Sequence, residues 1–335
     1  MDSPKKSQKK NDSAKLIPHF LQSKTWEKYQ KLEGHNTFYI EDDDFIANGV
    51  ITKTSLGNYL YCAYGPAAKD EKSLLKAVKA ILQLAKDNDA FFIRIEPTLA
   101  LAKEQIEKIA QKLGKYPIKK THDLDPAHTW IIDYKPNLDD TLADIEKDKT
   151  RVWRNYAKKG ISIRTTTNPD EIPAFMKLLR SVASNDNYVA QEEEHLKNQL
   201  RSGFGTLYLA DLDGRSGQPI AGVLVFDYKG TRYAMHAAAD YEHRRLKAGA
   251  ILQVQTIVDS HQAGGKHYDF WGITTSENPK HPWYGFTQYK KTFGGHQVDY
   301  TGTYDIILKP TKYRIYTILR KINRTKRLLL SKRSK

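Results

Sequence analysis

One order of secondary-structure elements occurs twice along this chain of 335 residues, and it restricts the available folds more than any other feature. In each half, an amphipathic helix precedes an apolar strand, and a second helix and strand follow. The elements predicted in the first half are a helix at 74–86, a strand at 90–96, a helix at 101–113 ended by Gly114 and a strand at 129–134. Those predicted in the second half are a helix at 250–261, a strand at 267–271, a helix at 283–293 ended by Gly294 and a strand at 297–308. The repeat predicts a duplicated α/β unit.

Short strands bounded by turn residues precede both blocks. They are predicted at 59–63, 205–212, 220–228 and 231–238. Each half is therefore expected to form a mixed sheet flanked by helices, an α/β fold of the α+β kind. We predict domains at 16–145 and 146–310, a charged connecting helix at 139–149, and terminal segments at 1–15 and 311–335.

The net charge of +15 is concentrated at the two ends of the chain. Residues 1–15 hold five Lys and two Asp, whereas residues 309–335 hold eleven Lys or Arg and no acidic residue. The rest of the chain is nearly neutral. We predict a disordered basic tail at 1–15 and a basic amphipathic segment at 311–335.

The sequence favours a cytoplasmic protein. No run approaches the 18 or so consecutive apolar residues that a membrane span requires, and residues 1–15 lack the apolar core of a secretory signal. The single cysteine, Cys62, excludes an internal disulfide and favours a reducing compartment.

Two stretches of the second half place a lysine-bearing helix next to a strand end. They are Tyr268-Asp269-Phe270-Trp271-Gly272-Ile273 and Gly285-Phe286-Thr287-Gln288-Tyr289-Lys290-Lys291-Thr292-Phe293-Gly294-Gly295. The first reads as a buried strand that ends at glycine, and the second as a short helix closed by two glycines. A lysine is thereby expected close to the end of a strand.

These stretches and several others together resemble the FemABX family of aminoacyl-tRNA-dependent peptidyltransferases, over about residues 19–320. The other stretches are Phe20-Leu21-Gln22-Ser23 with Trp26, Tyr59-Leu60-Tyr61 with Gly65-Pro66, Phe92-Ile93-Arg94-Ile95-Glu96-Pro97, Lys149-Thr150-Arg151 and Tyr241-Glu242-His243-Arg244. The resemblance implies two tandem GCN5-related N-acetyltransferase (GNAT) domains in a FemX-like member without a coiled-coil arm. It also implies transfer of an amino acid from aminoacyl-tRNA to a free amine of a peptidoglycan precursor stem peptide, which is cell-wall cross-bridge formation.

Lys290 is the main candidate for catalysis. Aminoacyl transfer to an amine passes through a tetrahedral centre that bears an oxyanion, and a fixed cation stabilises that developing charge. The resemblance places Tyr289 and Lys290 near the transferred group. From spacing alone, Lys290 and Lys291 read instead as an exposed pair on a helix.

Glu96 is the second catalytic candidate, because it follows an apolar strand and precedes Pro97. A carboxylate at a strand end could accept a proton from the attacking amine or hold that amine in place. The alternative is a salt bridge between Glu96 and Arg94 on one strand face.

Further residues are predicted to bind substrate: Lys24, Trp26, Arg94, Tyr289, His236 and Trp271. The resemblance implies a lysine near position 24 that meets the diphosphate of a UDP- or lipid-linked muropeptide, and exposed lysine without a role is the alternative. The segment 187–195 lacks an arginine that the family commonly has there, which favours a lipid-linked or altered acceptor unless Arg201 or Lys197 substitutes.

The basic C-terminal segment predicts contact with an anionic surface. Lys321, Arg324, Lys326 and Arg327 are candidates for tRNA binding, and an anionic membrane is the other candidate surface. A helix over 310–322 whose apolar face packs on the body is the structural alternative.

Two other functions remain open at this stage. The stretch Arg245-Leu246-Lys247-Ala248-Gly249-Ala250 approximates a pyrophosphate-binding loop and favours an acyl-coenzyme A dependent N-acyltransferase. A non-catalytic RNA- or membrane-binding module is the other. The scattered histidines show no metal spacing, and we expect a monomer without cofactor, with aminoacyl-tRNA as co-substrate.

Overall fold

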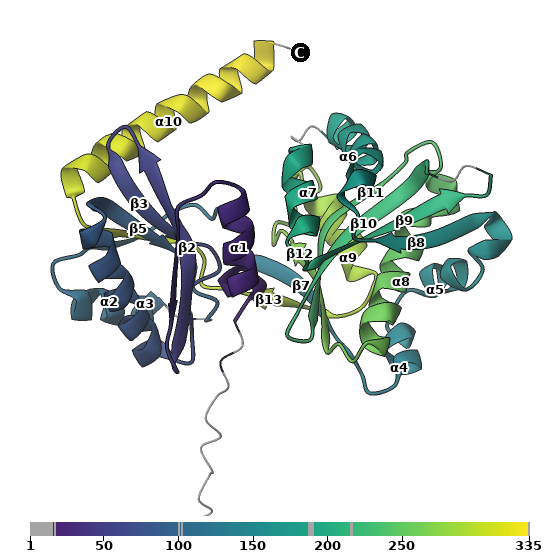
Figure 1. Cartoon of the computed structure of the whole chain (residues 1–335), viewed down its shortest axis with the longest axis horizontal. Coiled ribbons are helices and arrows are strands. Elements are labelled where there is room, and N and C mark those ends of the chain that lie inside the picture. The colour runs from purple at the N-terminus through teal and green to yellow at the C-terminus, as the bar shows by residue number, and fades with distance from the viewer. Residues whose placement is uncertain are drawn as a thin grey trace, which may run out of the picture.

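The computed structural model describes residues 16, 18–99, 101, 103–186, 191–214 and 217–333, with side chains except at 103, 184–186 and 323–333. These residues form two lobes side by side, each built on one mixed sheet (Figure 1). The fold predicted from the sequence, two mixed α/β units in tandem, is confirmed.

The first lobe contains a seven-stranded sheet. Its strands, in spatial order, are β1 (Thr37–Glu41), β2 (Phe45–Thr54), β3 (Gly57–Cys62), β5 (Ala90–Ile95), β14 (Tyr304–Ile307) and β6 (Ile118–Lys120), and the short β4 (Ala67–Ala68) pairs with β2. The parallel pair β3 and β5 is joined through helix α2 (Glu71–Asp87), as a parallel connection requires.

Helix α2 forms because its sequence carries both a start signal and one apolar face. The Asp70 side chain caps it by accepting from the Ser73 amide at 2.8 Å. Leu74, Val78 and Ile81 then follow at helical spacing and are buried against the sheet. Helix α3 (Lys103–Leu113) packs beside α2 on the same face, so the opposite face of β5 is left for other elements.

The second lobe also contains a seven-stranded sheet. Its strands, in spatial order, are β13 (His296–Asp299), β7 (His128–Asp133), β12 (His267–Gly272), β11 (Thr231–Ala239), β10 (Pro219–Tyr228), β9 (Gly205–Leu212) and β8 (Ile161–Thr166). Helices α6 (Ile172–Asp186) and α7 (Glu193–Arg201) share one apolar core with this sheet. Helix α8 (Ala248–Gln262) packs beside α5 (Lys147–Arg154) and contributes to a different core.

The two lobes exchange one strand each. Strand β7 comes from the first half of the chain and pairs with β12 in the second sheet. Strand β14 comes from the end of the second half and pairs with β5 in the first sheet. In both sheets the exchanged strand is flanked on its other side by a strand of its new lobe, β13 or β6. The exchange links the two lobes through both sheets.

The exchange changes part of the organisation predicted from the sequence. The predicted single strand at 297–308 is wrong, because the chain turns at Gly302, whose φ is +81°, and enters the other sheet as β14. The predicted division at 145 and 146 places β7 with the first unit and β14 with the second, which is the reverse of their pairing. The predicted connecting helix at 139–149 is two short helices, α4 (Leu138–Ala143) and α5.

The N-terminal segment also joins the lobes. Phe20 and Leu21, in the short helical turn η1 (Phe20–Gln22), are buried in the core of the second lobe. The next residue, Gln22, bonds to β2 in the first lobe, where its Oε1 accepts from the Asn48 amide at 2.8 Å. Helix α1 (Lys24–Leu32) follows, and α10 (Pro310–Arg333) ends the described chain after crossing the first lobe (Figure 1).

Candidate active site

A groove of about 1490 Å³ lies where the two lobes and α10 meet. Its lining includes Arg94 and Asp305 from the first sheet, the connection at 121–128, residues 273–275 after β12, residues 281–283 before α9 (Tyr284–Lys291), and α10 from Tyr313 to Lys321. The strand ends of both sheets therefore contribute to one surface. This is where strand-end side chains of an α/β fold meet a ligand.

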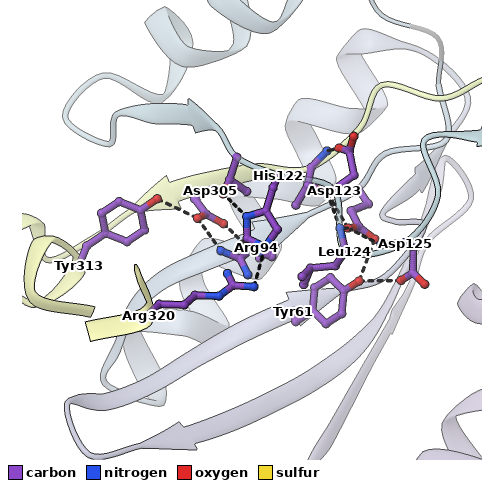
Figure 2. A network of polar contacts seen from close by, with 12 residues as sticks. Tyr61, Arg94, His122, Asp123, Leu124, Asp125, Asp305, Tyr313 and Arg320 are labelled. Carbon is purple, nitrogen blue, oxygen red and sulfur yellow. Dashed lines mark hydrogen bonds and ion pairs between the residues drawn. The ribbon is translucent and has the colours of Figure 1, made fainter. Parts of the chain in front are cut away.

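Glu96 and Asp125 form a carboxyl pair bridged by Tyr61, and Asp125 lines this groove; Figure 2 labels Tyr61 and Asp125. The Tyr61 hydroxyl oxygen lies 2.8 Å from Glu96 Oε2 and 2.6 Å from Asp125 Oδ2. A tyrosine hydroxyl has one proton and can donate to only one of them. The second contact is a hydrogen bond only when one carboxyl group is protonated. The geometry therefore favours an additional proton on the pair.

Burial supports this reading of the carboxyl pair. Glu96 is 6% exposed, and desolvation together with the nearby Asp125 carboxylate raises the pKa of Glu96. Desolvation likewise raises the pKa of Asp125. Glu96 Oε1 accepts from the Thr303 hydroxyl at 2.6 Å, which opposes the shift in the pKa of Glu96. Asp125 lines the groove, so the pair can exchange its proton with a ligand there.

Arg94 forms a buried ion pair on the floor of the groove. Its Nε and Nη2 donate to the two oxygens of Asp305 at 2.7 and 2.8 Å, in the bidentate geometry that suits guanidinium and carboxylate (Figure 2). Tyr313 on α10 donates to the same carboxylate at 2.8 Å. The alternative prediction of a salt bridge between Arg94 and Glu96 is wrong, because the exchanged strand β14 places Asp305 opposite Arg94.

Lys290 on α9 reaches back to the end of β12. Its ammonium nitrogen donates to the carbonyl oxygens of Gly272 at 2.5 Å and Trp271 at 3.3 Å. An ammonium group has three donors, so two fix its position and the third remains for another acceptor. Lys290 is half-buried, whereas Lys291 is exposed. The two lysines are therefore not the exposed pair that spacing alone indicates.

The peptide that Lys290 contacts is itself held in an uncommon conformation. Trp271 has φ +66°, in the left-handed region that a bulky residue rarely adopts. The Asp269 carboxylate accepts from the Trp271 amide at 2.7 Å and from the Thr129 hydroxyl of the exchanged strand β7. Burial lowers the pKa of Lys290 to about 8, and the Asp269 charge opposes that shift. Below this pH the group is predominantly a cation.

Gly272 and Pro126 form one contact between the lobes that adjoins both Lys290 and the carboxyl pair. A Cβ atom added to Gly272 would lie 2.4 Å from Pro126 Cγ, so only glycine permits this approach. Pro126 directly follows Asp125, and its carbonyl oxygen accepts from the Tyr64 hydroxyl at 2.7 Å. Gly272 thus gives its carbonyl oxygen to Lys290 and packs against the loop that carries Asp125.

Other predicted substrate-binding residues lie away from the groove. Lys24 pairs with Glu41 at 2.7 Å and is not among the residues that line the groove. Trp26 packs against Phe20 and Tyr29 with ring centroids 5.3 and 4.6 Å apart. Trp26 therefore joins α1 to Phe20 of η1.

The remaining candidates differ in their surroundings. Tyr289 is 38% exposed and packs on Phe293, with ring centroids 5.2 Å apart. The Nε2 atom of His236 is buried without a hydrogen-bond partner in the described structure, and burial lowers the pKa of His236 to about 4. The Trp271 ring packs on Tyr64 at 5.2 Å. His236 is thus neutral at physiological pH.

The structure describes the side chains of only some of the predicted cationic residues. Lys321 lines the groove, whereas the side chains of Arg324, Lys326 and Arg327 lie outside the described residues. Lys197 and Arg201, considered as substitutes for a family arginine, are paired with Glu193 and Glu194 near the start of their own helix α7.

The loop that resembles a pyrophosphate site is explained by packing. Ala248 is buried in a core with Val223 and Val225 of β10, Ala250 is buried in another core with Ala234 of β11, and a Cβ on Gly249 would lie 3.3 Å from Ala239 Cβ. Lys247 at the helix start pairs with Asp148 at 2.5 Å. Small residues here allow α8 to approach the sheet.

Two negative findings apply to the described part of the chain. Within it, no group of three or more His, Cys, Asp or Glu side chains could hold a metal ion. None of its helices combines the length and the hydrophobicity that crossing a bilayer requires.

Sequence reasoning did not assign Asp125 or Thr303 to the site. Asp125 precedes a proline in a loop, and Thr303 lies in the turn before the exchanged strand. The sequence offers one signal for Asp125. It precedes Pro126, and the residue before a proline favours an extended conformation.

The structure thus has two tandem mixed α/β units, a carboxyl pair whose Asp125 lines the groove, and a lysine fixed at the end of β12, outside the lining of the groove. The model of the FemAB family matches residues 9–207 and 208–321, so the chain belongs to the FemAB family, transferases of peptidoglycan cross-bridge formation.

Solved structures agree on the fold. The crystal structure of FemX has a TM-score of 0.75 at 16% identity and covers 89% of this chain and 94% of its own. L-PGS from Bacillus licheniformis has a TM-score of 0.53 at 12% identity, covering 90% of this chain and 94% of its own. The C-terminal domain of a putative lysylphosphatidylglycerol synthetase from Agrobacterium fabrum gives 0.54 at 12% identity, covering 88% and 90%. No curated protein matches significantly in sequence.

Proposed function

We propose that this protein transfers an amino acid from aminoacyl-tRNA to a free amine of a peptidoglycan precursor stem peptide. The observation that carries the proposal is the Lys290 ammonium, held by two backbone carbonyls in a chain of the FemAB family. An aminoacyl ester is already activated, so the reaction needs no cofactor, no metal and no nucleophilic side chain.

The proposed reaction is a direct attack of the acceptor amine on the ester carbonyl. The C–N bond forms, and the carbonyl oxygen becomes an oxyanion that the third N–H of Lys290 stabilises. The C–O bond to the terminal ribose of the tRNA then breaks. The amine releases a proton to the remaining carboxylate of the Glu96 and Asp125 pair, and the departing ribose oxygen takes up a proton from this pair and leaves as a hydroxyl group.

The partners follow from this chemistry. The donor is aminoacyl-tRNA, and the acceptor is a muropeptide linked to UDP or to a lipid. Lys321, Arg324, Lys326 and Arg327 stay predicted tRNA contacts, whose strength would fall with salt. We propose a monomer that acts in the cytoplasm, where charged tRNA is found.

The experiment is a product analysis with purified protein. A mixture of charged tRNAs is supplied with either the UDP-linked or the lipid-linked muropeptide, and the mass of the acceptor is measured by mass spectrometry. The proposal predicts a mass increase of one or more aminoacyl residues that requires charged tRNA. An acyl transfer that requires acyl-coenzyme A and ignores tRNA would contradict it.

A further inference from the structure

The outward face of α10 carries an exposed apolar stripe. Ile315, Ile318, Leu319 and Ile322 are 43%, 51%, 44% and 45% exposed. Their spacing of three, four and seven residues puts them on one side of the helix. The other side is occupied, because Tyr313 is buried and the Tyr316 ring lies 5.2 Å from that of Phe92. Ile315, Ile318 and Ile322 therefore face away from the body to which α10 is attached, while Leu319 at the edge of the stripe also lines the groove.

Positive charge accompanies the stripe. Arg314 and Lys321 are seven residues apart, so the helical period sets them on the same flank of the apolar face. No acidic residue occurs from position 306 to the end of the chain, while eleven Lys or Arg lie at 309–335. A helix with an apolar face and cationic flanks is suited to the interface of a membrane that contains anionic lipids.

We propose that α10 lies in the surface of an anionic bilayer. The exposed aliphatic side chains would enter the boundary between headgroups and acyl chains, and Arg314 and Lys321 would meet lipid phosphates. RNA fits this face less well, because nucleic-acid surfaces offer phosphates and stacking bases and little that removes isoleucine from water. No described helix is suited to cross a bilayer, which agrees with a helix lying in the surface.

The position of the stripe also indicates the class of acceptor substrate. Leu319 of the stripe and Lys321 on its flank both line the groove, and Trp283, which is 44% exposed, lines the groove from the second lobe. A membrane under α10 would thus border the groove in which Asp125 lies. We infer that the acceptor is lipid-linked, a substrate assignment that rests on the proposed transferase function.

The surface assignment is tested by vesicle flotation with the full chain. Vesicles of phosphatidylcholine with phosphatidylglycerol are compared with phosphatidylcholine alone. The wild type is expected to float with the anionic vesicles only, and the triple variant Ile315→Ser/Ile318→Ser/Ile322→Ser to lose this binding by roughly tenfold or more. Leu32→Ser is the matched control, because Leu32 is an aliphatic residue of α1 that is 50% exposed.

The outcomes separate the possible surfaces. Equal flotation of the triple variant and the wild type, or no flotation of the wild type, overturns the proposal. A loss of tRNA binding in the triple variant, with vesicle binding retained, also overturns it and assigns the stripe to RNA. Circular dichroism and thermal melts of the variant verify that it is folded.

The acceptor assignment is tested by activity. The triple variant should lose kcat/KM on a lipid-linked acceptor in vesicles by roughly tenfold and keep it on a soluble UDP-linked acceptor. Equal losses on both acceptors contradict the assignment. A wild type inactive on every acceptor refutes the proposed function, and the flotation result still decides the membrane surface.

Discussion

The Lys290 ammonium nitrogen lies 2.5 Å from the carbonyl oxygen of Gly272, and this hydrogen bond joins helix α9 to the end of strand β12. The Trp271 carbonyl oxygen accepts a second hydrogen bond from the same ammonium at 3.3 Å. Both carbonyls are fixed by the protein before any ligand arrives, so the cation does not reorganise when charge develops near it. Such preorganisation is the source of most electrostatic catalysis.

The alkaline side of the pH profile should report Lys290. Burial favours the neutral amine and lowers the pKa of Lys290 to about 8, so the ammonium is present below this pH and lost above it. The single-turnover rate of transfer should therefore fall as the pH rises through about 8. In Lys290→Arg this decline should be absent, whatever the remaining rate, because guanidinium stays charged. An unchanged alkaline decline in that variant would assign it to another group.

The acidic side of the profile should report the carboxyl pair. The raised pKa of Glu96 means that the carboxylate is lost at a higher pH than an ordinary glutamate, and the transfer rate should fall with it. Asp125→Asn removes the neighbouring charge, lowers the pKa of Glu96 and should shift this limb to lower pH. Asp43→Asn, at an exposed position outside the lining of the groove, is the control and should leave this part of the pH profile in place. If the acidic side of the profile stays at the same pH in Asp125→Asn, the proposed coupling between Glu96 and Asp125 is contradicted.

The ion pair of Arg94 and Asp305 should be important for stability. Their side chains are 2% and 0% exposed. Asp305→Ala leaves a buried guanidinium unpaired and should reduce the free energy of unfolding by about 3–5 kcal/mol. The double variant Arg94→Met/Asp305→Leu should regain most of this loss. Urea denaturation measures both. Glu41→Ala, which breaks the exposed pair with Lys24, should have little effect.

The contact between Gly272 and Pro126 should tolerate no side chain. Gly272→Ala forces apart the two loops that meet there, because the added Cβ would lie 2.4 Å from Pro126 Cγ. We expect a loss of about 1–3 kcal/mol in the free energy of unfolding and a lower transfer rate. Gly285→Ala is the control, since nothing lies within 4 Å of its Cβ. Comparable losses in both variants would show that the contact has no special importance.

Periodicity predicted most elements, because burial on one face leaves a pattern along the chain. Helices α2 and α8 and strands β5, β9 and β12 lie close to their predicted ranges. The exchange of β7 and β14 could not be predicted in this way. Alternation identifies a strand but not the sheet that it joins, and Asp305 faces Arg94 only because β14 crosses between the lobes.

The candidate site was partly accessible from the sequence. Lys290 and Glu96 were proposed as candidates from their positions near strand ends and from a family resemblance. Asp125 was not, because its contact with Tyr61 joins residues 64 positions apart and depends on the path of the loop before β7. The carbonyl partners of Lys290 were hidden for a similar reason, since every residue has a carbonyl group and only the fold selects two of them.

The most direct measurement is the single-turnover rate of aminoacyl transfer in Lys290→Met, with the exposed neighbour variant Lys291→Met as control. We predict that Lys290→Met retains its fold and loses about 10²–10³-fold in rate at pH near 7, while Lys291→Met stays close to the wild type. Transfer by folded Lys290→Met at the wild-type rate would contradict the central role assigned to this ammonium group.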